Sequence, residues 1–297
     1  MEEKHSRPLS AGRLLTYAAL ILAALYSFWP IMVMALEGYQ IDLSVLFSGR
    51  GIRYVGGVPD FSGGIFPSPI HYLDALTLVA FPRLLLNTAT VAAISIAVAL
   101  AAGVIAGYTL ARLPIRGKGA ISYMLLALRA VSPFAVLVPL YILYTHHGLW
   151  DTYFGVALAE ELVILSIVVW MLRGFFTDIP KEVYDAAAVF GASEWQIFRR
   201  VALRMVIPGI IVTALFGFVL IWNEFPLSDI LTGPVTKTVA VGVWSGLGES
   251  TSSFMQIDFA DLNAAGFLAW VPAIIIMLSI RKYLAKGYSL GTASTKA

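Results

Sequence analysis

Several charged side chains lie within long apolar stretches of this sequence, where they could carry ions or protons through a membrane. The four that we consider as material for such a path are Arg129, Glu160, Glu161 and Glu224. A charge at the centre of a bilayer costs at least about 2.5–3.5 kcal/mol on insertion scales, so such residues face a protein interior or water. Either of the two adjacent glutamates could pair with Arg129, or both could lie in water at the outer interface. Arg129 and Glu224 are therefore candidates for a translocation pathway or a charge relay.

The residues that precede Glu224 extend this set. Asn223 is a further candidate for pore lining. The indole of Trp222 could contact a substrate in such a pathway, although aromatic residues of membrane proteins more often pack or form belts at the interface. The pathway candidates are thus Arg129, Trp222, Asn223 and Glu224.

The sequence lacks the groups that common enzyme sites need. It has no cysteine, which excludes thiolate metal sites and a cysteine nucleophile. His146 and His147 are adjacent, but no third histidine or nearby carboxylate pattern completes a metal site. The pair Gly117-Lys118 does not fit G-x-x-x-x-G-K-S/T, so this chain has no phosphate-binding loop for ATP. We expect no enzyme activity, cofactor or metal on this chain; if ATP drives it, another chain supplies the ATP site.

Composition places the chain among polytopic, all-α membrane proteins. Of its 297 residues, 59% are apolar and 13% are charged, whereas soluble chains have roughly 25% charged residues. The net charge of +2 gives no reason to expect a nucleic-acid partner. Since about 20 apolar residues span a bilayer, the apolar runs predict six transmembrane helices. Their expected limits are 14–36, 84–110, 120–144, 154–176, 207–230 and 262–280.

These spans divide the chain into four parts. Residues 1–36 form a cytoplasmic tail and the first transmembrane helix. Residues 37–82, rich in glycine, proline and serine, form an extracytoplasmic loop. Residues 83–284 form the core transmembrane domain, which contains a polar insert at 177–205. Residues 285–297 form a second cytoplasmic tail.

Two of the expected spans have an unusual composition. The second span contains small residues such as Gly103 and Gly107, which let helices approach closely in lipid. The third contains Pro133 and Pro139, which leave backbone carbonyls that neighbouring groups or a cavity must satisfy.

The polar insert at 177–205 predicts a helix, a glycine turn and a second helix. Pro180 suits the first turn of a helix, because its missing N–H is not needed there. Gly191 can end that helix in a left-handed conformation. Ser193 and Gln196 have the spacing of a capping box that opens the second helix.

Both helices of this insert are predicted to be amphipathic. Val183, Ala187 and Phe190 would share one face of the first helix, with Glu182 and Asp185 on another. The second helix would carry an apolar stripe of Trp195, Phe198, Ala202 and Met205. Such a hairpin either packs on its own membrane domain or is presented to a partner.

Part of this insert resembles the EAA signature of the inner-membrane subunits of binding-protein-dependent ABC importers. That signature is Glu-Ala-Ala, three residues, Gly, nine residues and Ile-x-Leu-Pro. The matching residues here are Asp185, Ala186, Ala187, Gly191, Val201, Leu203 and Pro208.

Three positions depart from the family pattern. Asp185 replaces glutamate and keeps the charge. Arg204 replaces proline, so we expect the second helix to run further toward Pro208. Phe190 replaces the aspartate that usually precedes the glycine, which alters the surface offered to a partner.

The resemblance covers most of residues 80–285 and implies the type I ABC importer fold with six transmembrane helices. It implies a homologous second permease subunit, two cytoplasmic ATPase subunits that hold ATP and Mg, and an extracytoplasmic sugar-binding protein that meets the loops 37–82 and 231–260. A cytoplasmic helix-turn-helix at 180–205 would dock in a cleft of the ATPase. The coupling residues implied are Glu182, Asp185, Ala186, Ala187, Gly191 and Trp195.

The distribution of basic residues predicts the orientation in the membrane independently of the resemblance. Lys and Arg gather in the segments that six spans and an inner N-terminus place on the inside. Arg50, Arg53 and Lys237 fall in outer segments, and Arg83 lies at a border. Because basic residues favour the cytoplasmic side, both termini and the insert should be cytoplasmic, in a multi-pass protein of the inner (cytoplasmic) membrane.

A sugar or oligosaccharide is the expected substrate. The 37–82 loop, the segments 141–144 and 147–152 and the tail are similar to those of carbohydrate importers, nearest the second membrane subunit of maltose-type systems. Glycerol phosphate or another polyol is the alternative within the same family.

A rival interpretation, from a different class, is a self-contained secondary transporter. It would use the charges within the spans as a relay. Inverted repeats would favour it, but none is visible, and six spans are few for a monomeric carrier. A scaffolding membrane protein would explain the hairpin but not the polar residues inside the spans.

Overall fold

The computed structural model of this chain describes residues 11–39, 53–55, 58–60, 70–77, 81–130, 132–244, 262–276 and 278. The chain divides into two compact units: residues 1–79 with 246–268, and residues 80–245 with 269–297. The expected tail at 285–297, residues 1–10, much of the 37–82 loop and the second half of the 231–260 loop lie outside the described residues.

The first unit contains the first expected span and parts of the loop that follows it. Helix α1 (Ala11–Gly38) is followed by a two-stranded antiparallel hairpin, β1 (Arg53–Val55) with β2 (Val58–Asp60), and by helix α3 (Ile70–Thr77). Tyr72 of α3 holds the end of α1: its hydroxyl donates to the Ala35 carbonyl at 3.0 Å, and its ring lies 4.7 Å from that of Tyr39.

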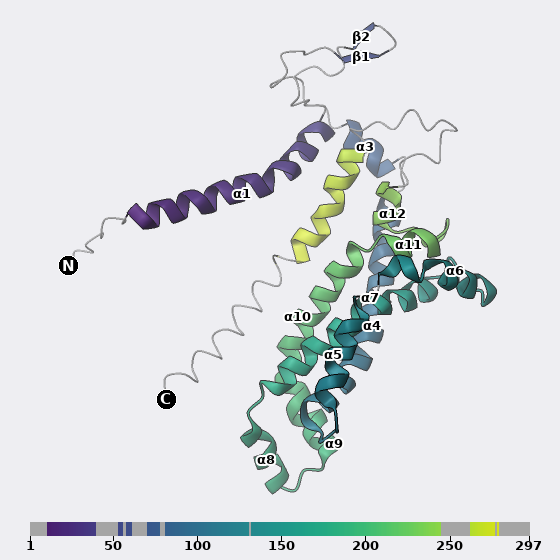
Figure 1. Cartoon of the computed structure of the whole chain (residues 1–297). Coiled ribbons are helices and arrows are strands. Elements are labelled where there is room, and N and C mark those ends of the chain that lie inside the picture. Colours follow the sequence, from purple (N-terminus) through teal and green to yellow (C-terminus); the bar gives the residue numbers. More distant parts are fainter. Residues whose placement is uncertain are drawn as a thin grey trace. The chain divides into compact units, whose positions relative to one another are not determined.

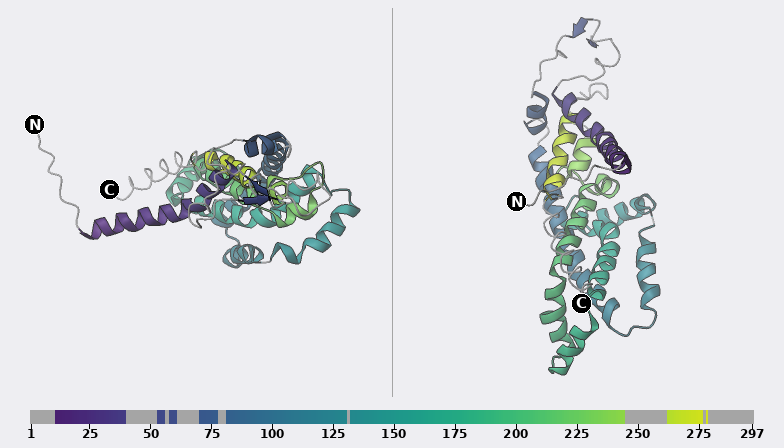
Figure 2. Two further views of the ribbon diagram at one scale, coloured as in Figure 1. Left: turned by 90° about the horizontal axis from the view of Figure 1, so that it is seen from above. Right: turned by 90° about the vertical axis from the view of Figure 1, so that its left-hand side faces the viewer.

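Three long helices form the core of the second unit. They are α4 (Phe81–Arg112), α7 (Tyr153–Thr177) and α10 (Leu203–Trp222). Figures 1 and 2 show them side by side along the length of this unit. Many of the fully buried side chains between them are apolar, for example Val91, Ile164 and Leu172, so apolar side chains fill much of the space between the backbones.

Helices α4 and α7 approach each other closely because α4 has glycine where the two meet. A Cβ at Gly103 would lie 2.6 Å from Cγ1 of Val168, and one at Gly107 would lie 2.9 Å from the backbone nitrogen of Arg173. The expectation that small residues of the second span permit close packing is therefore confirmed at these two positions. The same contacts show that α4 and α7 run parallel, since later residues of one meet later residues of the other.

Adding one methyl group at the α4–α7 contact should destabilise the protein. In Gly107→Ala the new Cβ meets backbone atoms, which cannot move aside as a flexible side chain can. Overpacking of this kind costs about 1–3 kcal/mol, and we expect a lower thermal midpoint in detergent. Gly174→Ala, whose Cβ would meet nothing within 4 Å, is the control; equal midpoints for the two variants would contradict the predicted packing.

The third expected span is not one continuous helix. Residues 120–144 are divided among α5 (Lys118–Leu128), a 3-10 turn, η2 (Pro133–Ala135), and α6 (Leu137–His146). Pro133 and Pro139 both lie in first turns, where a missing N–H costs nothing. The two prolines thus start new helices where a single long helix was expected.

The fifth expected span begins earlier and ends sooner than predicted. Glu194–Trp222 is one continuous helix of 29 residues, made of α9 (Glu194–Gln196), a π-helical turn, η3 (Ile197–Ala202), and α10. The expected extension of the hairpin helix toward Pro208 is confirmed. The helix stops at Trp222, not at residue 230, because Pro226 begins a separate short helix, α11 (Pro226–Leu231), which α12 (Val239–Trp244) follows.

Among the described residues, four helices are long and apolar enough to cross a membrane: Leu15–Gly38, Phe81–Arg112, Tyr153–Thr177 and Glu194–Trp222. The other two expected spans are represented by shorter apolar helices, which are Lys118–Leu128 with Leu137–His146, and Leu262–Ile276. The observed architecture is that of a helical membrane protein.

Candidate functional site

The insert at 177–205 folds as the predicted helix, glycine turn and helix, at one end of the second unit (Figure 1). Helix α8 (Lys181–Val189) begins directly after Pro180. Gly191 has a φ of +77°, which L-residues rarely adopt. The Ser193 hydroxyl accepts from the Gln196 backbone at 3.4 Å, and the Gln196 side chain accepts from the Ser193 backbone at 2.9 Å. The capping box and the left-handed glycine are therefore both confirmed.

The two faces of α8 differ from those predicted. Tyr184 is buried and Val183 and Ala187 are half-buried, so this side of α8 rests on the unit. Phe190, expected on the same face, is 90% exposed. Phe190 follows Val189, the last residue of α8, so its ring projects beyond the part of the helix that rests on the unit.

The apolar stripe of the second helix is also displaced. Ile197, Phe198 and Ala202 are buried, whereas Trp195 is 64% exposed and Met205 is 48% exposed. The π-helical turn accounts for this difference, because a wider turn rotates the residues before it relative to those after it. The Trp195 ring instead covers one side of Phe198, with 5.3 Å between the ring centroids.

A cluster of aromatic rings and one arginine seats α8 on the ends of α4 and α7. The Arg112 guanidinium lies 3.5 Å from the centre of the Tyr184 ring, a cation–π contact. Tyr108 packs against Phe176 and Phe198, at 5.5 and 4.8 Å between centroids. We call Tyr108, Arg112, Phe176, Tyr184 and Phe198 the hairpin seat.

The hairpin seat was not predicted from the sequence. Burial raises the pKa of Tyr184 to about 12; the Arg112 charge opposes this rise and Tyr108 adds to it. The Tyr184 hydroxyl donates to the Phe176 carbonyl at 3.4 Å. A tyrosine next to Val183 on an amphipathic helix, together with an arginine at the end of the second expected span, was the available signal.

Removing the Tyr184 ring should loosen α8 from the unit. Tyr184→Ala leaves a cavity under the Arg112 guanidinium, and loss of a buried aromatic ring costs about 3 kcal/mol or more. Tyr184→Phe keeps the ring and loses only a long hydrogen bond, which is worth about 0.5–1.5 kcal/mol. Hydrogen exchange of the α8 amides should therefore accelerate strongly in Tyr184→Ala and little in Tyr184→Phe. Similar exchange rates in the two variants would show that the hairpin seat does not hold α8.

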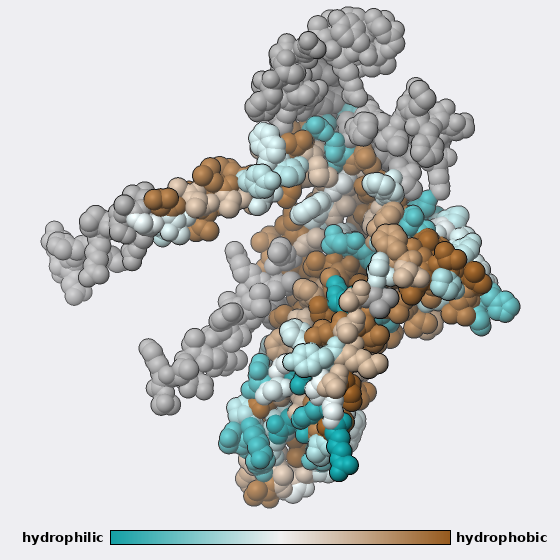
Figure 3. Space-filling model, viewed as in Figure 1, coloured by the Kyte–Doolittle hydropathy of each residue, from teal (hydrophilic) through white to brown (hydrophobic). Residues whose placement is uncertain are grey.

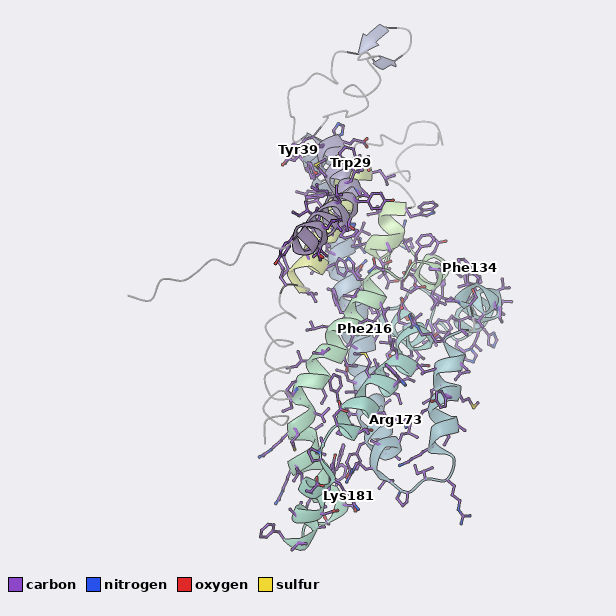
Figure 4. The ribbon with its side chains drawn as sticks, turned by 60° about the vertical axis from the view of Figure 1, so that its left-hand side comes forward. Trp29, Tyr39, Phe134, Arg173, Lys181 and Phe216 are labelled. Atoms are coloured by element: carbon purple, nitrogen blue, oxygen red, sulfur yellow. The ribbon has the colours of Figure 1, made fainter. Side chains whose placement is uncertain are left out.

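The outer face of α8 carries most of the predicted coupling residues. Glu182, Asp185 and Ala186 are exposed, and Asp185 lies 3.9 Å from the Lys181 ammonium one turn earlier. Lys181 lies at this end of the unit in Figure 4, beyond Arg173 of α7. Ala187 points toward the unit itself, so it is not on the face that a partner would meet.

The four pathway candidates separate into two kinds of environment. Trp222 is buried, and its indole donates to the Ala269 carbonyl at 3.0 Å. Asn223 is exposed and donates to the Val219 carbonyl of its own helix at 2.8 Å. Arg129 is exposed, and its guanidinium donates to the Val163 carbonyl of α7. None of these bonds joins one candidate to another.

Glu224 is buried and caps a helix. Its carboxylate accepts from the backbone N–H groups of Leu227 and Ser228, at 2.9 and 3.0 Å, which are first-turn donors of α11. The Ser228 hydroxyl donates to Glu160 at 3.3 Å. Glu160 is fully buried, so its suggested position in water is wrong, and it bonds to Ser228 and not to Arg129.

A second polar cluster, at the opposite end of the unit from the hairpin, ties three segments together. The Asp151 carboxylate accepts from the backbone N–H groups of Gly233 (2.8 Å), Val235 (3.1 Å) and Thr236 (2.9 Å), and from the Thr236 hydroxyl (2.7 Å). Asp151 has a φ of 54°, which aspartate tolerates better than most residues. This geometry fixes the segment that follows α11.

Asn87 of α4 completes this cluster. Its amide donates to the carbonyls of Val235 and Lys237, at 3.0 and 2.9 Å, and its oxygen accepts from the Tyr153 hydroxyl at 2.7 Å. We call Asn87, Asp151, Tyr153 and Thr236 the Asp151 clasp. The partners of Asn87 lie far from it in the sequence, and its local sequence did not suggest them.

The Asp151 clasp should lose stability in acid. Burial alone would raise the pKa of Asp151, but the hydrogen bonds from Thr236, Gly233 and Val235 outweigh it and hold the pKa below its ordinary value. Its stabilisation is therefore complete above the unfolded-state pKa of about 3.9 and is lost as the pH falls through the lower folded-state pKa.

Replacing Asp151 by asparagine tests this contribution. Asparagine keeps the left-handed backbone but places an NH2 group against backbone donors, so we expect a loss of about 1–3 kcal/mol at pH 7. The difference in thermal midpoint between the wild type and Asp151→Asn should shrink as the pH approaches 3. A difference that is the same at pH 7 and pH 3 would show that the charge of Asp151 is not the stabilising feature.

A shallow pocket of about 340 Å³ lies between α6 and α7 and is lined mainly by apolar residues. Its lining includes Leu140, Leu143, Leu158 and Leu162. A sugar ring needs several hydrogen-bonding partners, whereas the side chains of this lining offer only Tyr144 and His147, so the pocket is a poor candidate for a sugar site.

Comparisons with known proteins agree with the helical architecture. Residues 99–288 match the family model described as "Binding-protein-dependent transport system inner membrane component". A probable ABC transporter permease protein of Sinorhizobium fredii is 30% identical over 273 residues, which cover 92% of each chain. A diacetylchitobiose uptake system permease protein of Streptomyces coelicolor is 30% identical over 223 residues, covering 75% of this chain and 73% of that protein.

The fold is shared with a membrane subunit of a solved importer. The crystal structure of a bacterial ABC transporter involved in the import of the acidic polysaccharide alginate aligns with a TM-score of 0.70 and 17% identity, over 95% of this chain and 99% of that chain. The predicted fold class, that of ABC importer membrane subunits, is thereby confirmed.

Proposed function

Because this chain belongs to the family of binding-protein-dependent transport system inner membrane components, we propose that it forms half of the translocation pathway of an ATP-driven sugar or oligosaccharide importer. The observation that carries the proposal is the 177–205 hairpin, which is rigidly seated on the span ends yet exposes its outer face. A surface of this kind can transmit a movement from a partner to the spans.

The helix Glu194–Trp222, which begins in the hairpin and continues into α10, is long enough to support a docking role. Its 29 residues extend about 43 Å at 1.5 Å per residue, whereas the hydrocarbon core of a bilayer is about 30 Å thick. About 13 Å of this helix can therefore project into water. Arg199, Arg200 and Arg204 are exposed on the projecting part, as expected of a cytoplasmic end.

The proposed partner at the hairpin is a cytoplasmic ATPase subunit that binds ATP and Mg, which this chain is not expected to bind. Closure of two such subunits would draw the paired hairpins together. Since the hairpin helix continues into α10 and α8 is held by the hairpin seat, the movement would reach α4, α7 and α10. The ATPase can shift the equilibrium between two states only if it contacts the hairpin differently in each.

We further propose which proteins complete the transporter and which substrate it carries. A homologous second permease subunit would complete the pathway, and an extracytoplasmic sugar-binding protein would meet the loops 37–82 and 231–260. Both termini would be cytoplasmic. The uptake of diacetylchitobiose by one relative supports a sugar substrate, and glycerol phosphate or another polyol is the alternative.

The geometry gives less support to the alternative that this chain is a self-contained secondary transporter. A relay needs its charged groups in sequence along a path. Here Glu224 caps α11 and Glu160 bonds to Ser228, while Arg129 bonds to the backbone carbonyl of Val163, three residues after Glu160 on α7. These roles stabilise the fold and leave the acidic groups separate from the arginine.

A pull-down with bulky substitutions tests the coupling proposal. The tagged wild type in mild detergent should recover a P-loop ATPase and a second permease subunit. Ala186→Trp places a large ring on the exposed face of α8. A substitution at Gly191 would instead strain the left-handed backbone there, which other residues rarely adopt. We expect it to reduce ATPase recovery and transport at least about tenfold, while Leu128→Trp, exposed on α5, retains both. A homogeneous homo-oligomer of the wild type without ATPase would contradict the proposal.

A further inference from the structure

The tip of the hairpin exposes apolar side chains where the acidic residues of α8 end. Val189 is 86% exposed and Phe190 is 90% exposed. Glu182, Asp185 and Val189 follow one another on the outer face of α8 at i, i+3 and i+7, so this face changes from charged to apolar toward the turn. In Figure 3, apolar surface reappears at the extreme end of the unit, beyond a mostly hydrophilic zone.

An exposed phenylalanine at this place does not serve the fold of this chain. The backbone at Gly191, the next residue, has open space around it, and the inner side of α8 is already held by Tyr184. Burial of a phenylalanine side chain is stabilising, and the folded chain does not use this contribution at Phe190. A single exposed aromatic on a rigid turn has the form of an anchor for a protein partner.

The position of Phe190 argues against burial in lipid. Arg199, Arg200 and Arg204 are exposed on the hairpin helix and mark the level of the head groups, where basic side chains favour the interface. Phe190 precedes this helix and lies beyond its N-terminal end, further from the spans. Its partner is therefore in the cytoplasm.

We propose that Phe190, with Val189 beside it, inserts into an apolar pocket of the cytoplasmic ATPase subunit and provides most of the affinity at this contact. This inference rests on the proposed function and concerns what holds the two proteins together. The charges of α8 contribute less, because Asp185 already faces Lys181 at 3.9 Å and both side chains are largely in water, where ion pairs are worth about 0–1 kcal/mol. A partner pocket lined by basic residues, as the acidic signature alone would suggest, is not required.

The test measures the affinity of the wild-type chain in nanodiscs for the purified P-loop ATPase subunit that copurifies with it. Phe190→Ala should weaken binding at least about tenfold, and Phe190→Leu should retain most of it. The double variant Glu182→Gln with Asp185→Asn should change the affinity less than about threefold. The wild-type affinity should also vary little between low and high salt, since salt screens exposed charges but not apolar contacts.

Controls separate this proposal from the function on which it rests. Phe134→Ala, which truncates another exposed phenylalanine, should bind as the wild type does, and the thermal midpoint of Phe190→Ala should be unchanged. If the wild type recruits no ATPase, the proposed function fails. Two results would overturn only the apolar anchor. In the first, the wild type binds the ATPase and Phe190→Ala binds it equally well. In the second, the acidic double variant loses binding and the wild-type affinity depends strongly on salt.

A fluorescent label distinguishes the membrane from the ATPase as the surroundings of the tip. The chain has no cysteine, so Val189→Cys gives a single labelling site next to an intact Phe190. A polarity-sensitive label there should shift to the blue when the ATPase is added and should not be quenched by brominated lipids. Quenching by those lipids before ATPase is added would place the tip in the membrane and overturn the proposal.

Discussion

The close parallel contact of α4 with α7 is the constraint on which the rest of the second unit depends. Because Gly103 and Gly107 leave room for Val168 and the α7 backbone, the ends of the two helices are brought together at both sides of the unit. At one end this places Arg112 beside Tyr184, and at the other it places Asn87 beside Tyr153. The hairpin seat and the Asp151 clasp both follow from this one packing arrangement.

The two clusters use different chemistry at the two ends. The hairpin seat is aromatic and cationic, with few hydrogen bonds, and it holds a helix whose outer face stays open. The Asp151 clasp consists of directional hydrogen bonds to backbone groups. These bonds fix an irregular segment, whose backbone groups lack the regular hydrogen bonds of a helix or strand. An apolar seat can tolerate small rotations of the hairpin, whereas the clasp specifies one geometry of the loop.

The sequence was sufficient to predict the elements whose signals are local. Gly191, Ser193 and Gln196 predicted the turn and the cap, because these motifs depend on neighbouring residues alone. The long apolar runs predicted the spans, and the spacing of Asp185, Ala186 and Gly191 predicted the family.

Contacts between distant residues could not be predicted in the same way. Asp151 is separated from Thr236 by 85 residues along the chain, and nothing in either segment indicates the other. Helical periodicity also failed where the helix was not an ideal α-helix, as at Trp195 and Met205, and where it ended, as at Phe190. The sequence suggested that Glu160 or Glu161 pairs with Arg129, but Glu160 bonds to Ser228. Glu224 caps a helix that begins with Pro226, a role that only the fold reveals.

The π-helical turn between the hairpin and α10 has a consequence for how this family can diversify. A π turn is an α-helix with one additional residue, so it can be gained or lost by a single-codon insertion or deletion. Loss of one residue between Ile197 and Ala202 would restore regular α-helix and leave Trp195 and the tip close to their present orientation relative to α10, because the wider turn accommodates its additional residue. One such event would keep the surface of the tip in place, and it would be visible in related genes as a one-residue gap at this position.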